Sequence, residues 1–214
     1  MNIASLVWAT PNAEELLAKI ARVSNPANQE NPSFEGLIKY MIKHHHWSPF
    51  EMVSAVVEIN TTRDIGRQIL RHRSFSFQEF SQRYADATLL PPIGLRECRM
   101  QDTKNRQSSI PTNDAALSRD WEYDQRLLYD MAEALYKDAL AKGIAKEQAR
   151  ALLPEGLTPT RMYMAGTLRS WLHYLQLRTG PETQKEHRQV AQSIFLALEP
   201  SFPVTFPAVF NGNQ

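Results

Sequence analysis

Hydrophobic and polar positions change their spacing along the chain, and these changes predict an order of strands and helices. Residues 52–59 read M-V-S-A-V-V-E-I, and their β-branched side chains favour a strand. Residues 3–8 predict a second, shorter strand. Apolar residues three and four apart predict helices elsewhere, over residues 11–22, 34–45, 63–71, 115–141, 146–153, 160–178 and 182–198. Periodicity alone therefore indicates a helix-rich mixture of α and β structure.

Residues with known capping preferences set the expected ends of these helices. Ser33 is expected to cap the second helix. Thr61 or Thr62 is expected to cap the helix that follows the main strand. Gly143 is expected to end the longest helix, because glycine readily takes the left-handed conformation found there.

The longest helix, over 115–141, follows a stretch with little regular pattern. Residues 88–109 carry two adjacent prolines and then polar side chains, which predicts a long loop. Within the helix, apolar residues stand at the spacing of a core-facing stripe: Trp121, Leu127, Leu128, Met131 and Leu135. We therefore expect the helix to pack on a core by this stripe.

Composition limits the class of protein. With 214 residues, 43% hydrophobic and 22% charged, the chain is typical of a globular protein with one sizeable core, as one domain or a domain with an appendage. A formal net charge of +1 argues against long contacts with nucleic acid. The single cysteine, Cys98, excludes an internal disulfide and fits a reducing compartment. Neither a signal-peptide pattern nor an apolar run of about eighteen residues is present, so we expect a cytoplasmic protein.

Residues 71–83, which read R-H-R-S-F-S-F-Q-E-F-S-Q-R, hold the most unusual chemistry of the chain. Arg71, His72 and Arg73 are adjacent, and Arg83 closes the segment. Polar groups fall on every face, so neither a helical nor a strand period applies. Arginine forks match phosphate oxygens two at a time, which predicts a site for phosphate anions. Solvated charges at the end of a surface helix are the alternative.

A second basic set lies far away in the sequence and strengthens the anion hypothesis. It comprises Arg150, Arg161, Arg169 and Arg178. Arg161 and Arg169 are eight apart on the helix expected over 160–178, which also carries apolar residues. Two arginine-bearing helices with apolar faces indicate a cleft lined with phosphate ligands. Charges at helix ends or interfaces are the alternative.

Other candidate chemistry is weaker. His44, His45 and His46 diverge around a helix and have no Cys, Asp or Glu at ligand spacing, so no metal site is predicted. Cys98 has arginines on both sides, which is a setting of reactive thiols, yet a lone loop cysteine is more often incidental. The chain has 8 glycines and no glycine-rich phosphate loop, which excludes a Rossmann or Walker pattern.

The segment 71–83 closely resembles the R-H-R-x-x-S-x-x-E-x-S-x-R signature of flavin-dependent thymidylate synthases. This signature is specific, because it fixes seven of thirteen positions. Further blocks resemble the family in the same order: A-R-V-S at 21–24, H-W-S-P-F-E at 46–51, R-Q at 67–68, L-R-S at 168–170, L-Q-L-R at 175–178, and Gln184 with Glu186. The resemblance thus covers most of the chain.

This resemblance implies a fold, an activity and partners. The fold would be α+β and helix-rich, a single domain over residues 1–214 with a central mixed or antiparallel sheet flanked by helices. The activity would be reductive methylation of dUMP to dTMP, with methylenetetrahydrofolate as carbon donor, FAD as redox cofactor and NADPH as reductant. Members of the family are homotetramers whose active sites combine several subunits.

The resemblance also assigns residues to the two ligands. Positions that contact dUMP match Gln68, Arg71, Glu79, Ser81, Gln82, Arg83, Arg150 and Arg178. Positions that contact FAD match Ser24, His46, Ser48, Glu51, His72, Arg73, Ser74, Gln78, Glu79, Arg169 and His173, with folate expected to stack near His46. As catalytic residues, Arg178 would stabilise charge on the uracil ring, and Ser81 would orient the substrate without acting as a nucleophile. Cys98 lies outside every matching block.

Four residues depart from the family pattern and keep hydrogen-bonding capacity: Gln78, Thr167, His173 and Thr183. Two alternative functions remain. One is a related flavin and folate enzyme that forms another 5-substituted deoxyuridylate, such as a hydroxymethyl product. The other is a nucleotide- or nucleic-acid-binding protein without catalysis.

Overall fold

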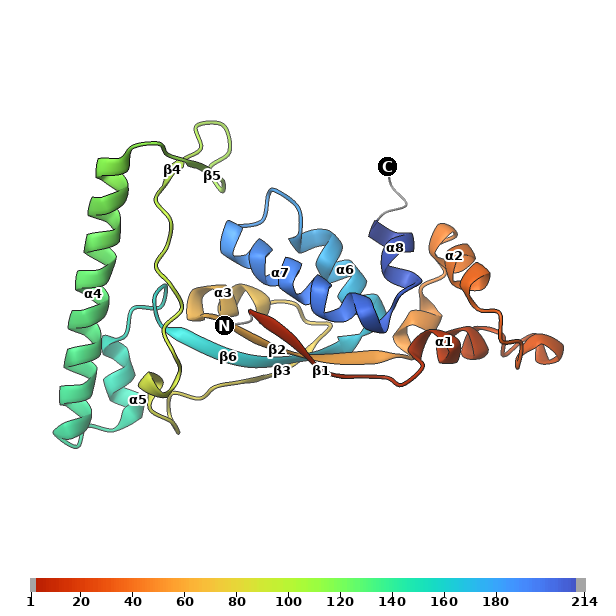
Figure 1. Cartoon of the computed structure of the whole chain (residues 1–214). Helices are drawn as coiled ribbons and strands as arrows, with labels where there is room; N and C mark the ends of the chain where they lie inside the picture. Colours follow the sequence, from red (N-terminus) through yellow and green to blue (C-terminus); the bar gives the residue numbers. More distant parts are fainter. Residues whose placement is uncertain (1–2, 211–214) are drawn as a thin grey trace.

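A central antiparallel sheet organises the computed structural model, which describes residues 3–210 (Figure 1). Its strands lie in the order β1 (Ala4–Ala9), β2 (Ser54–Thr62), β6 (Pro159–Thr167) and β3 (Ser76–Glu79). One face of the sheet is covered by α3 (Arg63–Ile69), α6 (Leu168–Arg178) and α7 (Lys185–Leu198). A sheet flanked by helices confirms the α+β prediction, and its pairings are antiparallel.

The alternation of side chains along β2 explains which face the helices cover. Ala55, Val57 and Ile59 are fully buried, whereas Glu58 and Asn60 between and beside them are only half-buried. Alternate residues of a strand point to opposite faces, so the apolar set faces the helices. The main strand predicted over 52–59 is therefore confirmed, although it begins and ends slightly later.

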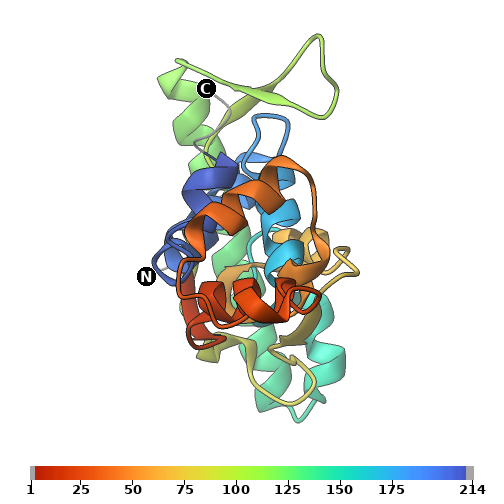
Figure 2. The same cartoon turned by 90° about the vertical axis from the view of Figure 1, so that its right-hand side faces the viewer.

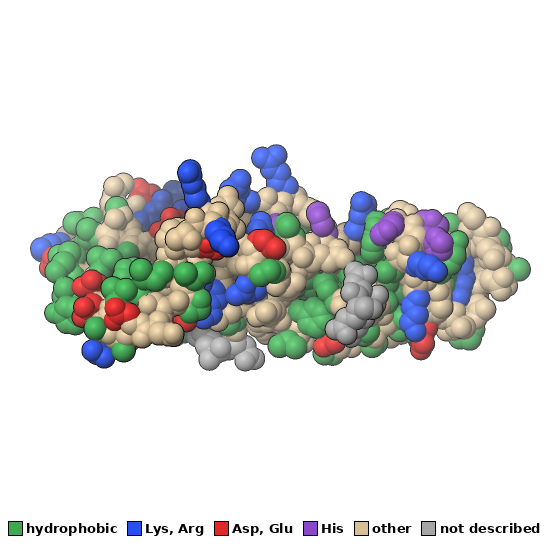
Figure 3. All heavy atoms as spheres, turned by 90° about the horizontal axis from the view of Figure 1, so that it is seen from above, with side chains coloured by type: hydrophobic (Ala, Val, Ile, Leu, Met, Phe, Trp, Pro, Cys, Tyr) green, Lys and Arg blue, Asp and Glu red, His purple; other side chains and the backbone are tan. Residues whose placement is uncertain are grey.

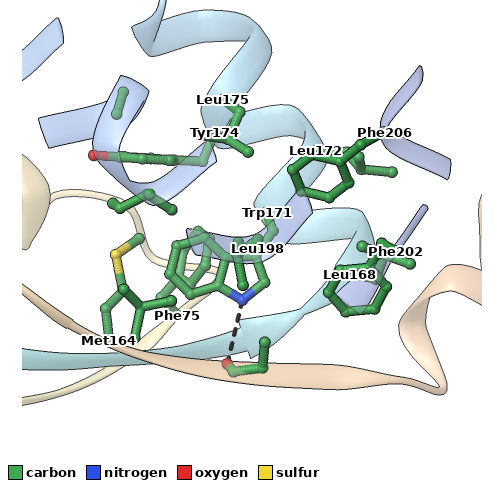
Figure 4. Close-up of a cluster of buried hydrophobic side chains, with 14 of the residues drawn as sticks. Phe75, Met164, Leu168, Trp171, Leu172, Tyr174, Leu175, Leu198, Phe202 and Phe206 are labelled. Atoms are coloured by element: carbon green, nitrogen blue, oxygen red, sulfur yellow. Dashed lines mark hydrogen bonds between the residues drawn. The ribbon is translucent and has the colours of Figure 1, made fainter. Parts of the chain in front are cut away.

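The core between the sheet and α6 is built around Trp171 (Figure 4). Its ring is fully buried, and its Nε1 donates a hydrogen bond of 3.2 Å to the carbonyl oxygen of Ala55 on β2. Phe75 packs edge-on against it, with ring centroids 4.7 Å apart. A Cβ on Gly166 of β6 would lie 2.4 Å from Cδ1 of Phe75, so only glycine leaves room for this ring. The packing fixes the segment before β3 against α6.

The helix expected over 160–178 is wrong in its first half. Residues Pro159–Thr167 form strand β6, in which Met162 and Met164 are buried and Tyr163 between them is exposed. This alternation is a strand period, and the helix begins only at Leu168, where the Thr167 hydroxyl accepts a 3.3 Å hydrogen bond from the Ser170 N–H. Arg161 and Arg169 therefore do not share a helix.

The longest helix, α4 (Ala115–Ala141), has the predicted bounds and stands at one end of the molecule (Figure 1). Gly143 has a φ of 81°, and its N–H and that of Ile144 bond the carbonyls of Leu140 and Ala139, which confirms the predicted end. The helix packs on α5 (Lys146–Ala149) and η4 (Arg150–Leu152).

The expectation that the apolar stripe of α4 packs on the core is wrong in this chain. The five residues named for the stripe are 42–56% exposed. Gln125, Ala132, Tyr136 and Ala139 are buried instead, because only that side of the helix meets neighbouring segments. A wide apolar surface of α4 thus stays open.

The other end of the molecule gathers three helices (Figure 2). They are α1 (Ala13–Ala21), α2 (Glu35–Lys43) and α8 (Thr205–Phe210), with short 3-10 turns η1 (Pro26–Asn28), η2 (Ser48–Glu51) and η5 (Glu199–Ser201) nearby in the chain. Ser33 does not cap α2; Phe34 takes that position without a side-chain cap. Thr62 does precede α3, but its hydroxyl bonds Oδ1 of Asp64 at 2.5 Å rather than capping the helix.

The loop predicted over 88–109 contains more structure than expected. After η3 (Ala87–Leu89), an extended stretch leads to the hairpin of β4 (Arg99–Gln101) and β5 (Ser109–Pro111). The side-chain amide of Gln101 donates to the backbone carbonyls of Asp102, Arg106 and Ser108. These hydrogen bonds hold the turn of the hairpin, although the sequence there shows no strand period. Among residues 3–210, no helix is both long and apolar enough to cross a membrane.

Candidate active site

Arg178 and His72 bring the end of α6 beside the segment that follows α3. Nε of Arg178 donates a hydrogen bond of 3.0 Å to Nε2 of His72. Burial, followed by the charges of Arg178 and His173, lowers the pKa of His72 to about 4. The ring is therefore neutral near pH 7 and accepts from the guanidinium, which holds Arg178 in one orientation.

A chain of polar side chains, which begins at buried Tyr174 and His187 and runs outward to half-buried Gln68 and exposed Gln184, lies next to this pair. The ring of Tyr174 meets the His72 ring edge-on, with centroids 4.8 Å apart. Its hydroxyl is 3.0 Å from Nε2 of His187, and Nδ1 of His187 is 3.2 Å from Oε1 of Gln68. Nε2 of Gln68 in turn donates to Oε1 of Gln184 at 2.8 Å. Gln68, on α3, is thereby tied to α6 and α7.

A second group joins η2, α6 and the segment before β3. Arg169 donates to the carboxylate of Glu51, and the Ser170 hydroxyl donates to the Ser74 carbonyl at 3.3 Å. Ser48, Arg73 and His173, together with Ser74, are exposed on the same three segments. Hydroxyl, guanidinium and imidazole groups of this kind suit the phosphate and sugar oxygens of a flavin nucleotide.

A third group forms where the end of the signature segment meets α5. Nε of Arg83 lies 3.4 Å from Oε2 of Glu147, and Nε of Arg150 donates to the backbone carbonyl of Glu147 at 3.2 Å. Both arginines are exposed, and these contacts use only part of their donors. The pair can therefore still grip an anion such as phosphate.

Glu79 is half-buried and Gln82 is buried. In the sequence, both lie between Ser74 of the second group and Arg83 of the third. Oε1 of Glu79 accepts a hydrogen bond of 2.7 Å from the Thr160 hydroxyl and lies 3.5 Å from Nη1 of Arg63. Gln82 is 5% exposed, and its Nε2 has no hydrogen-bond partner among the described residues. A buried amide donor without a partner is costly, so it marks a place that a polar ligand would complete.

The structure does not bring every candidate residue together. Ser24, His46, Arg71, Gln78 and Ser81 are exposed. Within residues 3–210, no chain of side-chain hydrogen bonds or ion pairs joins the Arg178 group to the Arg83 group. Seen from above, Lys and Arg side chains stand over the helix-covered face, and histidines gather over the α2 end (Figure 3). The candidate residues form separate basic areas on a single chain.

Two residues of the site were missed by reasoning from the sequence. Tyr174 and His187 are 1% and 0% exposed, and neither of them was singled out from the sequence. The signal for His187 was present: it directly follows Glu186 of a matching block and shares a helical stripe with Val190, Ala191 and Ile194. A histidine on such a stripe is buried and therefore needs hydrogen-bond partners.

The described residues contain no group of three or more His, Cys, Asp or Glu side chains that could hold a metal ion. Cys98 is half-buried and lines a cavity of about 750 Å³ together with Arg99, Leu117, Trp121 and Leu128. This cavity lies between α4 and the stretch leading into β4, apart from the contacts of Arg178 and His72.

Solved structures of nucleotide methylases resemble this fold. A UMP/dUMP methylase, PolB from Streptomyces cacaoi, bound with 5-Br dUMP, superimposes with a TM-score of 0.79 at 29% sequence identity, covering 96% of this chain and 93% of the methylase chain. The same methylase bound with 5-Br UMP gives a TM-score of 0.80 at 28% identity. The fold and its polar groups thus place the chain with proteins of nucleotide-methylase architecture.

The sequence comparisons define the family. Residues 5–204 match the family model described as thymidylate synthase complementing protein. The flavin-dependent thymidylate synthase of a Synechocystis species is 50% identical, covering 92% of this chain and 87% of that protein. A probable flavin-dependent thymidylate synthase of Paramecium bursaria Chlorella virus 1 is also 50% identical, with 92% and 91% coverage. The chain belongs to the flavin-dependent thymidylate synthase family.

Proposed function

We propose that this chain methylates C5 of dUMP to form dTMP, with methylenetetrahydrofolate as carbon donor and NADPH as reductant. FAD, when bound, would carry the reducing equivalents from NADPH to the transferred carbon. The observation that supports this most strongly is the Arg178–His72 contact, because it presents a fixed cation beside the segment whose signature places the chain in the family.

The nucleotide would be held by residues of two groups. Arg71, Arg83 and Arg150 are exposed cations suited to the phosphate. Arg178 would sit at the uracil edge and stabilise negative charge as it develops on the ring. The free Nε2 of buried Gln82 would gain a partner when the nucleotide binds. Ser81 would orient the substrate.

The flavin would be held by the group around Glu51 and Arg169. Ser48, Arg73, Ser74 and His173 offer donors and acceptors from three segments, and Ser24, His46, His72 and Gln78 complete the set implied by the family. His46 is exposed next to the α2 end, where folate would stack. These residues bind and orient, and the redox chemistry belongs to the cofactor.

We further propose a homotetramer with shared active sites. No side-chain hydrogen bond or ion pair of residues 3–210 connects the Arg178 group to the Arg83 group, so one nucleotide would be contacted by groups from different subunits. The open apolar side of α4, with Leu127, Met131 and Leu135 about half exposed, offers a surface that a second copy would cover. We also propose that both hydrophobic clusters of the chain belong to one domain. The protein would be cytoplasmic, because its single cysteine fits a reducing compartment.

The absorbance spectrum of the purified protein, followed by NADPH oxidation with and without dUMP, tests this proposal. We expect a bound flavin and an oxidation rate that responds to dUMP. A colourless protein that neither takes up FAD nor oxidises NADPH would contradict the proposal and favour a binding protein without catalysis.

A further inference from the structure

Tyr174 and His187 are polar, buried and given no part in the function proposed above. They lie on neighbouring helices, α6 and α7, and form a hydrogen bond with each other in the protein interior. A buried polar pair costs stability unless its hydrogen bonds are complete, so its partners indicate why it is there. A series of side-chain hydrogen bonds runs from Tyr174 through His187, Gln68 and Gln184 to Glu186.

The carboxylate at the end of this chain fixes the direction of every hydrogen bond in it. Glu186 only accepts, so the amide nitrogen of Gln184 must face it, at 3.0 Å from Oε2. The oxygen of Gln184 then faces Gln68, which must present its nitrogen, at 2.8 Å. The oxygen of Gln68 is consequently directed at Nδ1 of His187, 3.2 Å away.

This direction determines the tautomer of His187. Nδ1 must carry the proton in order to donate to Gln68, so Nε2 of the neutral ring accepts from the Tyr174 hydroxyl. Burial, then the charges of Arg178 and His72, lowers the pKa of His187 to about 3. Burial also raises the pKa of Tyr174. Both groups therefore stay neutral near pH 7, as the hydrogen bonds require.

The other end of the chain is anchored by arginines. Burial by itself would raise the pKa of Glu186, but hydrogen bonds from Arg99 and Gln184, a backbone hydrogen bond and the charge of Arg96 outweigh it and lower that pKa. Arg96 lies 3.3 Å from Oε2 of Glu186 and 2.8 Å from Oδ1 of Asp64. The carboxylate stays ionised, so the direction of the chain does not reverse near pH 7.

We propose that His187 is a positioning residue that sets the orientation of the Gln68 amide for binding of the nucleotide base. One Gln68 N–H is used by Gln184 and one lone pair of its oxygen by His187. A second N–H and a second lone pair remain on a residue that is half-exposed. With the amide held in one orientation, the remaining donor and acceptor can pair with the acceptor and donor of a uracil edge. This inference rests on the proposed function, because it takes Gln68 as a nucleotide contact.

Two substitutions at one position separate this role from simple packing. In His187→Asn the side-chain nitrogen takes the place of Nδ1 and can still donate to Gln68, but the acceptor for Tyr174 is lost. In His187→Gln the terminal amide takes the place of Nε2 and keeps the acceptor for Tyr174, but the donor to Gln68 is lost. Each variant removes one of the two hydrogen bonds of the buried His187 ring, so we expect similar losses of melting temperature.

The dUMP dissociation constant of the FAD-bound enzyme, followed by the change of flavin absorbance, is the readout. We expect His187→Gln to weaken dUMP binding roughly tenfold, as the loss of an oriented hydrogen-bonding group does, and His187→Asn to remain within about twofold of the parent protein. The exposed substitution Gln189→Ala on the same helix is the matched control. FAD affinity should be the same in all of these variants.

The Gln68→Ala background shows whether the effect passes through Gln68. We expect Gln68→Ala to weaken dUMP binding and His187→Gln to add nothing to it. Equal dUMP dissociation constants for His187→Gln and His187→Asn, or an undiminished His187→Gln effect in the Gln68→Ala background, would overturn the inference. If the parent protein turns over dUMP but Gln68→Ala binds it normally, the inference fails while the proposed function stands. If the parent protein does not bind dUMP, the proposed function itself fails.

Discussion

Nε of Arg178 donates a hydrogen bond of 3.0 Å to Nε2 of His72, and this contact joins the last residue of α6 to the signature segment. An imidazole that accepts at Nε2 is neutral, in agreement with its pKa of about 4. The cation of Arg178 is thus not offset by an opposite charge in this contact. It is available to stabilise an anion that forms on a bound ring.

Replacing Arg178 by alanine should therefore remove turnover while leaving FAD bound. Loss of a charge-stabilising donor is expected to raise the activation barrier by roughly 3 kcal/mol or more. The rate of dTMP formation and the flavin absorbance of the same preparation give the two readouts. Arg188→Ala on α7 is a control, because this half-buried arginine donates only to the backbone carbonyl of Pro181. A near-normal rate for Arg178→Ala would rule out the proposed role.

Cys98→Ser should retain activity. The thiol lines the cavity beside α4 and makes no contact with Arg178, His72 or Gln68 among the hydrogen bonds of the described residues. The steady-state rate of dTMP formation measures the effect, and circular dichroism checks the fold. An inactive variant with native spectra would contradict this expectation and reopen the question of a cysteine nucleophile.

Met131→Glu should reduce self-association and activity together. Met131 is 56% exposed on the apolar side of α4, and a carboxylate buried there without a partner would oppose contact with a second copy. Light scattering coupled to size exclusion gives the mass. Arg119→Glu, on the charged side of the same helix, is the control and should keep the parent mass. An unchanged mass for Met131→Glu would show that this side of α4 is not an interface.

Stability should fall in acid partly through His187. Its pKa is lowered to about 3 in the folded protein from an ordinary value of 6.5, so the unfolded chain binds this proton more readily. The stabilising contribution is complete above pH 6.5 and is lost as pH falls towards 3, by about 1.4 kcal/mol per pH unit inside that window. His72 acts in the same direction down to about pH 4, with a smaller effect because its half-buried ring is partly screened by solvent.

The difference in unfolding free energy between the parent protein and His187→Asn isolates this contribution. Urea titrations between pH 7.5 and about 4 should show the difference shrinking as pH falls, because the variant lacks the titrating ring. A difference that stays constant over this range would mean that His187 is not buried in its neutral form.

Gly166→Ala should destabilise the protein by about 1–3 kcal/mol, the usual cost of overpacking a core. The new Cβ would lie 2.4 Å from the Phe75 ring, which is held against Trp171. Gly36→Ala on α2 is the control, because a Cβ there meets nothing within 4 Å. Denaturant unfolding of both variants measures the effect, and equal stabilities would contradict the packing described for Phe75.

The sequence predicts those parts of the fold whose pattern allows only one period. Both bounds of α4 were predicted correctly from its apolar spacing and from Gly143 just beyond its end, and the structure adds a cap at its start, where the Asp114 side chain accepts from the N–H groups of Ala116 and Leu117. Strand β6 was missed because Met164 and Leu168 are four apart and continue in step with the stripe of α6. Only the burial of Met162 and Met164 against exposed Tyr163 separates the strand from a helix.

The site could be predicted as a set of residues but not as an arrangement. The signature segment named Arg71 to Arg83, yet the separation of Arg83 from Arg178 depends on the path of the chain in space. The stripe on α4 was visible, but its pattern is the same whether the chain's own core or a second copy covers it. His187 was not predicted as part of the site, because its partners Tyr174 and Gln68 come from other helices and are not visible in the sequence around it.

The mass of the nucleotide formed from dUMP tests the central proposal most directly. Purified protein with FAD, NADPH and methylenetetrahydrofolate should convert dUMP to a product with the mass of dTMP, and omission of either NADPH or the folate should abolish it. A hydroxymethyl product would contradict the proposed reaction and assign the chain to a different transfer chemistry. Unchanged dUMP with all components present would contradict catalysis altogether.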